Sequence, residues 1–121
     1  MVLINATPTG RLLKEAGNSL YVRGLINHLG KFDGADDVFL TFDDGYIGGL
    51  ENAEFIEGYG VVFIKVHKEP YKAKELIGKT WVCFLRKRLA ELKNWEAEVY
   101  FELDDDKVFA NITKEKIVEK N

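Results

Sequence analysis

Carboxylates gather at several places in this sequence, and carboxylates can bind metal ions or act in acid–base catalysis. The clustered residues are Asp36, Asp37, Asp43, Asp44, Glu102 and Asp104–Asp106. They fall at the starts of expected strands or in expected turns, where Asp is favoured because it forms local hydrogen bonds. The spacing of a calcium-binding loop is missing. We therefore expect these residues to be turn residues.

The other side chains that could do chemistry are isolated. His28 and His67 have no partner at a metal-ligand spacing, so we expect them to be surface or packing residues. Cys83 is the only cysteine, and its neighbours Val82 and Phe84 form an apolar setting in which we expect a buried, unreactive thiol. The glycines match neither phosphate-binding fingerprint. The sequence thus predicts a protein that is not an enzyme, binds no metal and needs no cofactor.

Length and composition favour one domain over residues 1–121. Of these residues 46% are hydrophobic and 31% are charged, and domains of roughly 100–150 residues bury a substantial core. No apolar stretch approaches the ~18 residues of a membrane span, and one cysteine cannot form an intramolecular disulfide. We therefore expect a cytoplasmic protein without membrane contact. Glutamine is absent and Lys and Glu are abundant, which is the trend of hyperthermophile proteins.

An internal repeat organises most of the chain. Residues 19–32 align with residues 79–92 at an offset of 60, and residues 38–47 align with residues 99–108 at an offset of 61. Leu29, for example, aligns with Leu89. The alignment predicts a tandem duplication whose parts are a first unit at about 19–66, a linker at 67–78 and a second unit at about 79–113.

Each unit is expected to hold one amphipathic helix followed by a hairpin. Apolar residues with the i, i+4, i+7 spacing of one helix face are Leu25, Leu29 and Phe32 in the first unit and Leu85, Leu89 and Leu92 in the second. The pattern then alternates with period two, as in half-buried strands, over residues 38–42 and 99–103. We predict an α+β fold of tandem duplicated strand–helix–hairpin units forming a DNA-clamp-like domain, with helices on one face of an antiparallel sheet.

Further strands complete the expected sheet. They are placed at residues 2–7, 20–22, 46–55, 60–67, 80–83 and 108–112. Residues 9–18 could form another strand or a short helix. We expect Gly60–Val66 and Val108–Ile112 to be edge strands, and unpaired edges favour a homo-oligomer joined through them.

Positive charge gathers on the two expected helices. Residues 23–32 carry +2 and residues 84–94 carry +3, which leaves −8 for the rest of a chain whose net charge is −3. Helices placed side by side would form one basic face, suited to sequence-independent contact with the DNA backbone. The residues expected on this face are Arg23, His28, Lys31, Arg86, Lys87, Arg88 and Lys93.

The chain resembles a sliding-clamp domain of the proliferating-cell-nuclear-antigen type. The similar segments are LYVRGLINHLGKF, DDVFLTFDDGYIGGL and YGVVFIKV in the first unit and TWVCFLRKRLAEL and AEVYFELDDDKVFANI in the second. In that family two helices line the DNA-facing wall with Lys and Arg. The resemblance implies a single-domain, non-enzymatic processivity factor that contacts DNA or assembles with replication or repair proteins.

A second family competes for residues 17–47. GNSLYVR, followed by LG and DDVFLTFDDGYI, is similar to the swapped-hairpin DNA-binding domains of transition-state regulators and antitoxins. This resemblance implies a transcription regulator that binds DNA as a dimer. A third alternative is a viral or defence-related interaction protein that mimics a clamp surface. The mass in solution separates them, because a ring, a dimer and a monomer are expected respectively.

Overall fold

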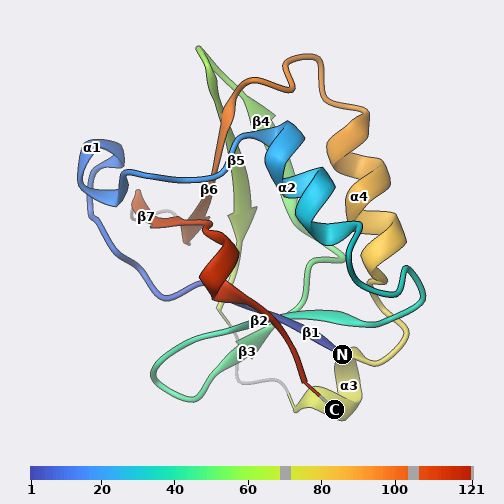
Figure 1. The fold of residues 1–121 in the computed structure, drawn as a ribbon. Helices are drawn as coiled ribbons and strands as arrows, with labels where there is room; N and C mark the ends of the chain where they lie inside the picture. The colour runs from blue at the N-terminus through green and yellow to red at the C-terminus, as the bar shows by residue number, and fades with distance from the viewer. Residues whose placement is uncertain (69–71, 104–106, 121) are drawn as a thin grey trace.

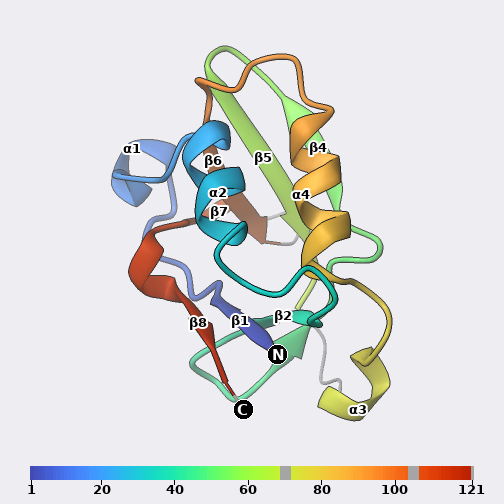
Figure 2. The same ribbon diagram turned by 45° about the vertical axis from the view of Figure 1, so that its right-hand side comes forward.

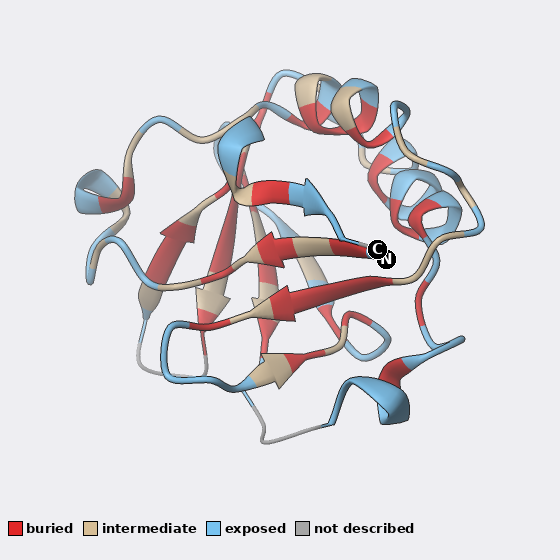
Figure 3. Cartoon of the chain, turned by 60° about the horizontal axis from the view of Figure 1, so that its bottom comes forward, coloured by how far each residue is buried: buried red, intermediate tan, exposed pale blue. Residues whose placement is uncertain are grey.

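A computed structural model describes residues 1–68, 72–103 and 107–120 of this chain. The fold is α+β, with two four-stranded mixed sheets and, over the described residues, four α-helices and one short 3-10 helix (Figure 1). Both sheets contribute to one hydrophobic core, and Figure 3 shows that buried positions run along the strands of both. Among the described residues, no helix is long and apolar enough to cross a membrane.

The first sheet has the order β3-β2-β1-β8. Its strands are β1 (Val2–Asn5), β2 (Val38–Thr41), β3 (Ile47–Gly48) and β8 (Ile117–Glu119). The central pair β1 and β2 is parallel, and the outer strands β3 and β8 pair antiparallel to it. This sheet therefore joins the two ends of the described chain.

The second sheet has the order β4-β5-β6-β7. Its strands are β4 (Glu54–Glu57), β5 (Val61–Val66), β6 (Glu98–Leu103) and β7 (Val108–Asn111). Here too the central pair, β5 and β6, is parallel, and both outer strands are antiparallel to it. The two sheets thus share one arrangement of strand directions.

Two longer helices connect the parallel strands. They are α2 (Val22–Leu29), between β1 and β2, and α4 (Val82–Ala90), between β5 and β6. Single-turn helices precede each of them, α1 (Leu13–Ala16) and α3 (Ala73–Leu76), and the 3-10 helix η1 (Lys114–Lys116) leads into β8. Figures 1 and 2 both place α2 beside α4, and the two helices are in contact.

The predicted helix faces are confirmed. Leu25, Leu29, Leu85 and Leu89 are buried in the core, and Phe32 and Leu92 are half-buried and pack against it. The Lys and Arg side chains predicted to lie outside, at positions 23, 31, 86, 87, 88 and 93, are exposed. Helical periodicity alone was sufficient for this result, because residues three and four apart share one face.

The segment before each long helix pairs with a strand of the other sheet. The Leu20 carbonyl accepts the N–H of Val99 at 2.9 Å, and the Leu20 N–H donates to the Ile112 carbonyl at 2.8 Å. In the opposite direction, the Val38 N–H donates to the Thr80 carbonyl at 3.0 Å. The two sheets are therefore interlocked by an exchange of segments.

The single antiparallel sheet expected from the sequence is wrong. A helix that crosses from one strand to the next returns the chain in the same direction, so β2 and β6 pair parallel to β1 and β5. The short strands expected at 20–22 and 80–83 are reduced to single bridges at Tyr21 and Trp81, because each helix begins at the next residue. The strand expected at 46–55 is divided into β3 and β4.

One of the two expected edge strands is also wrong. Gly60–Val66 contains β5, which lies between β4 and β6. The chain reverses just before β5, where the Gly58 N–H donates to the Val61 carbonyl at 2.8 Å and Gly60 has a φ of 74°. Glycine adopts this angle without a steric penalty. The other expected edge, β7, does lie at the edge of its sheet.

Candidate nucleic-acid interface

The basic residues are positioned by the antiparallel packing of α2 and α4. Near the start of α2, the Arg23 N–H donates to the Trp95 carbonyl, which follows α4, at 2.9 Å. Near the start of α4, the Cys83 N–H donates to the Gly34 carbonyl, which follows α2, at 2.9 Å. These bonds fix the two helices side by side in opposite directions, as Figure 2 shows.

Helix α4 carries cations on three sides. Arg86 reaches toward α2, where its Nε donates to the Ile26 carbonyl at 3.2 Å. Arg88 lies over the ring of Phe55 in β4, with its guanidinium carbon 4.2 Å from the ring centre. Lys87 lies between these two directions and points outward, because successive helical residues are rotated by about 100°. Three adjacent cations therefore spread over the outer half of this helix.

The other cations lie at the helix ends. Arg23 forms an ion pair with Glu96, at 2.7 Å from Nε to the carboxylate, and its guanidinium carbon is 5.2 Å from the Trp95 ring centre. Lys31 and Lys93 follow α2 and α4 and are exposed. Within the described part of the chain, Arg23 is the one cation among these six that has an acidic partner. We call Arg23, Lys31, Arg86, Lys87, Arg88 and Lys93 the helix-pair surface.

His28 differs from the other residues expected on this face. Both of its ring nitrogens are buried and have no hydrogen-bond partner among the described residues. The ring packs edge-on against Phe32, with centroids 5.6 Å apart. Burial lowers the pKa of His28, and the nearby Lys31 and Lys114 lower it further. The structure therefore places this imidazole as a neutral packing group and leaves it out of the helix-pair surface.

An aromatic pair beside these cations was not singled out from the sequence as a surface feature. Trp81 and Phe84 stack with their ring planes 8° apart and their centroids 5.1 Å apart. Trp81 exposes 39% of its surface and Phe84 exposes 48% of its own. The three-residue spacing at the start of a helix is the signal that could have revealed the pair.

A hollow of about 140 Å³ lies beside Phe84 of this pair. Its walls combine apolar, cationic and anionic side chains, namely Leu50, Glu51, Phe55, Lys79, Thr80, Phe84, Leu85 and Arg88. The hydroxyl of Thr80 is buried and has no hydrogen-bond partner among the described residues. The hollow thus lies between an exposed ring and a wall residue, Thr80, whose hydroxyl is covered and, over the described ranges, unpaired.

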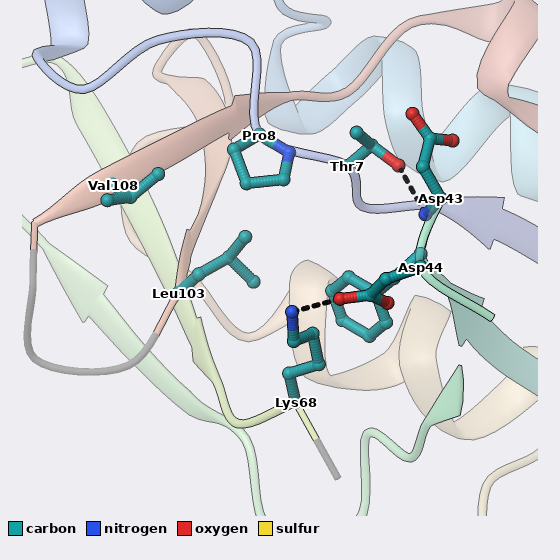
Figure 4. A pocket seen from close by; sticks show the side chains of 8 residues that line it. Thr7, Pro8, Asp43, Asp44, Lys68, Leu103 and Val108 are labelled. Atoms are coloured by element: carbon teal, nitrogen blue, oxygen red, sulfur yellow. Dashed lines mark hydrogen bonds and ion pairs between the residues drawn. The ribbon is translucent and has the colours of Figure 1, made fainter. Parts of the chain in front are cut away.

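A larger hollow of about 260 Å³ lies at the turn after β2. Figure 4 shows Lys68 pointing toward Asp44, with which it forms an ion pair, and Thr7 receiving the N–H of Asp43 at 3.1 Å. Asp44 also accepts the N–H of Tyr46 at 3.2 Å, as an Asp in a turn is expected to do. The predicted turn role of Asp43 and Asp44 is thereby confirmed.

The other candidate residues are distributed over the surface. The Asp36 carboxylate lies 3.9 Å from the N-terminal amine, and Asp37 accepts the N–H of Gly78 at 2.7 Å. Glu102 lies in β6 and is half-buried, whereas Asp104–Asp106 lie outside the described residues. His67 is exposed. Over the described ranges, no three His, Cys, Asp or Glu side chains are arranged to hold a metal ion.

The expectation of a buried Cys83 is wrong, because this residue is exposed. Helix α4 begins at Val82, which is fully buried, and the next helical position is rotated by about 100° away from the core. Apolar neighbours such as Val82 and Phe84 therefore predict the burial of a residue only when the point at which the helix begins is also known.

Comparison with protein-family models, with curated proteins and with solved structures finds no match to this chain. What the chain binds must therefore be inferred from its own surface.

Proposed function

We propose that this chain is a non-catalytic module that binds the DNA backbone through the helix-pair surface. The observation that carries this proposal is the placement of Arg86, Lys87 and Arg88, which point in three directions from α4 and have no acidic partner among the described residues. Phosphates along a strand could reach these cations without any particular base sequence. Such contacts release counterions, so binding is expected to weaken steeply as salt increases.

The negative charge of the rest of the chain would orient the protein so that its two long helices face the DNA. The two helix segments carry +5 together, whereas the remainder carries −8. A polyanion is repelled by the acidic remainder and attracted to the helices, because the summed field extends beyond individual contacts. The net charge of −3 is therefore compatible with a locally basic binding face.

We also infer that the chain is a tandem duplication, and we call residues 1–57 the first half and residues 61–119 the second half. The order β1-α1-α2-β2-β3-β4 in the first half is repeated as β5-α3-α4-β6-β7-β8 in the second, where the 3-10 helix η1 is added before β8. In each sheet the fourth strand comes from the other half: β8 joins β1, and β4 joins β5. This correspondence extends the repeat from the aligned segments to the N-terminal strand.

The exchanged segments favour the swapped-hairpin alternative over the sliding clamp. The residues before α2 pair with β6, and those before α4 pair with β2. A swapped-hairpin dimer exchanges segments between two chains, so one chain here would supply both halves of such a dimer. Its internal two-fold relation would match the symmetry of a DNA duplex, as dimeric regulators match theirs. On this reading, binding needs no second copy.

Charge reversal at exposed lysines tests the proposal. We expect the triple variant Lys31→Glu, Lys87→Glu and Lys93→Glu to lose binding to a labelled duplex in fluorescence anisotropy at low salt. The salt-dependence slope of any residual binding should decrease by about one unit per lost phosphate contact. The melting temperature should change little, because exposed charges contribute little to stability.

The matched control reverses three lysines away from the helix pair. Lys14, Lys74 and Lys120 are exposed, and changing all three to Glu alters the net charge by the same amount. Equal loss of binding in both variants would reduce the effect to net charge and contradict a defined binding face. If the unmodified chain does not bind duplex or single-stranded DNA at low salt, the interaction-protein alternative replaces DNA binding.

Oligomeric state separates the remaining alternatives. A monomer by analytical ultracentrifugation, with and without DNA, supports the single-chain swapped-hairpin reading. A large closed assembly supports the clamp reading instead, joined through a sheet edge such as β4, because the outer side of β7 already pairs with Gly10 at Phe109.

A further inference from the structure

We propose that Trp81, Phe84 and the hollow beside them bind an unpaired base, which makes single-stranded nucleic acid the preferred ligand of this protein. This inference rests on the proposed function, because it uses the same side of α4 and needs its cations to hold the phosphates. It goes further by naming the ligand class, and it assigns a role to aromatic side chains that backbone contact does not require.

The first observation is the geometry of the aromatic pair. Two stacked rings that expose 39% and 48% of their residue surfaces leave ring area open to solvent. The Phe84 N–H donates to the Trp81 carbonyl at 3.0 Å, so both residues are fixed on the first turn of α4. A base that stacks on this pair would meet a preformed surface and lose little conformational entropy there.

The second observation is the position of the cations. Lys87 and Arg88 lie three and four residues after Phe84, so the direction of Phe84 around the axis of α4 falls between those of the two cations. Lys79 is exposed just before the helix and lines the same hollow. Cations therefore flank the aromatic pair at both ends. Aromatic side chains for bases combined with a basic track for the backbone are the usual features of single-strand binding sites.

The third observation is the unpartnered hydroxyl of Thr80, a residue in the wall of the hollow. Thr80 is 8% exposed, and its Oγ1 has no hydrogen-bond partner among the described residues although it can donate and accept. Glu51 and Arg88 line the same space, so acceptor and donor groups converge there. Leaving a buried polar group unpaired costs free energy. Rotation of the Thr80 side chain toward the hollow would let its hydroxyl bond a base edge and recover that cost.

The first half lacks this arrangement, which argues against a purely structural pair. The positions 60 residues before Trp81 and Phe84 are occupied by Tyr21 and Gly24. Helix α2 begins and packs in the same way as α4 without a ring at its third position. The fold therefore does not require Phe84, and the single aromatic pair would hold a strand on the α4 side only.

The test compares four ligands of equal charge per strand: oligo(dT), oligo(rU), an abasic oligonucleotide and a DNA duplex. We expect the parent protein to bind oligo(dT) or oligo(rU) more tightly than the duplex, and the DNA and RNA arms show which sugar is preferred. Phe84→Leu keeps an apolar side chain but removes the ring. It should weaken binding to the normal oligonucleotides by about 5- to 150-fold, the loss of one stacked base.

The abasic oligonucleotide makes the test independent of how well a variant folds. The parent should bind it as weakly as Phe84→Leu binds oligo(dT), and Phe84→Leu should cause no further loss with it. Tyr21→Ala removes the exposed ring at the equivalent position of the first half and should leave all affinities unchanged. Binding to the duplex should be the same in the parent and in Phe84→Leu.

The outcomes separate this inference from the proposed function. If duplex and oligonucleotide bind but Phe84→Leu weakens neither, the aromatic pair is not a base-binding site and backbone binding stands. If the abasic and normal oligonucleotides bind the parent equally, base stacking is likewise contradicted. If the parent binds none of the four ligands at low salt, both proposals fail.

Discussion

Helices α2 and α4 occupy equivalent places between parallel strands, yet they differ on the side that faces solvent. Three equivalent inward positions are alike, apolar and at most 3% exposed: Val22, Leu25 and Leu29 in one helix and Val82, Leu85 and Leu89 in the other. Helix α2 also buries Ile26, where α4 has the exposed Arg86. Their outward residues differ, since α2 has Gly24 and Asn27 where α4 has Phe84 and Lys87. The shared inward positions are what the fold requires, so the outward positions of the two helices could diverge, and we propose a binding surface on one of them only.

The largest expected effect tests whether the inward residues of the two helices contribute equally to stability. Leu29→Ala and Leu89→Ala remove side chains that are 0% exposed, and each should lower the free energy of unfolding by about 2–5 kcal/mol by leaving a cavity. Urea denaturation would measure both. A near-neutral result at one position only would show that the two helices contribute unequally to the core.

A smaller effect is expected where the exchanged segments differ. The Ser19 hydroxyl accepts the N–H of Ile112 at 2.7 Å and donates to the Val99 carbonyl, whereas the equivalent residue in the second half is Lys79. Ser19→Ala leaves that N–H without its partner and should cost about 1–3 kcal/mol by urea denaturation. Lys79→Ala is the control and should stay within about 0.5 kcal/mol of the parent. Equal effects would show that the hydroxyl does not stabilise the exchange.

The smallest expected effect concerns pH and distinguishes His28 from its exposed counterpart Arg88. The pKa of His28 is lowered in the folded state, so the unfolded chain takes up a proton more readily. The stabilising contribution of neutral His28 is therefore fully present above its unfolded pKa of about 6.5 and is lost as the pH falls toward the folded pKa.

Urea midpoints between pH 7.5 and pH 5 would reveal this loss. His28→Leu keeps an apolar group at the position and should remove the part of the pH dependence that lies just below the unfolded pKa. Carboxylates titrate at lower pH, so the comparison with the parent is restricted to this window. A parent whose stability does not change there would show that the imidazole is solvated.

The sequence was informative wherever one local pattern decides the structure. Period 3.6 predicted which sides of α2 and α4 are buried, and period two predicted β2 and β6. It could not reveal which strands pair, because the partners of the segment at Leu20 lie about 80 to 90 residues away, at Val99 and Ile112. The parallel pairs, the central place of β5 and the last strand β8 all depend on such distant contacts.

The candidate surface was predictable to the same extent. Six cations were correctly expected to be exposed because they fall outside the apolar stripe of each helix. His28 also falls outside that stripe, but Phe32 covers its ring, and Lys114 and Glu115 from the far end of the chain lie close enough to shift its pKa. The aromatic pair was missed because large aromatic side chains such as Trp81 and Phe84 are usually buried. They are exposed here because Val82 occupies the inward position at the start of α4, and its neighbours point away from the core.

The exchange of segments also determines how the fold depends on concentration. When two chains exchange segments, dilution separates them and the folded state is lost by mass action. Here the segments before α2 and α4 belong to one polypeptide, so the exchange is an intramolecular event governed by a fixed effective concentration. The melting temperature of this protein should consequently be the same in a dilute solution as in a concentrated one.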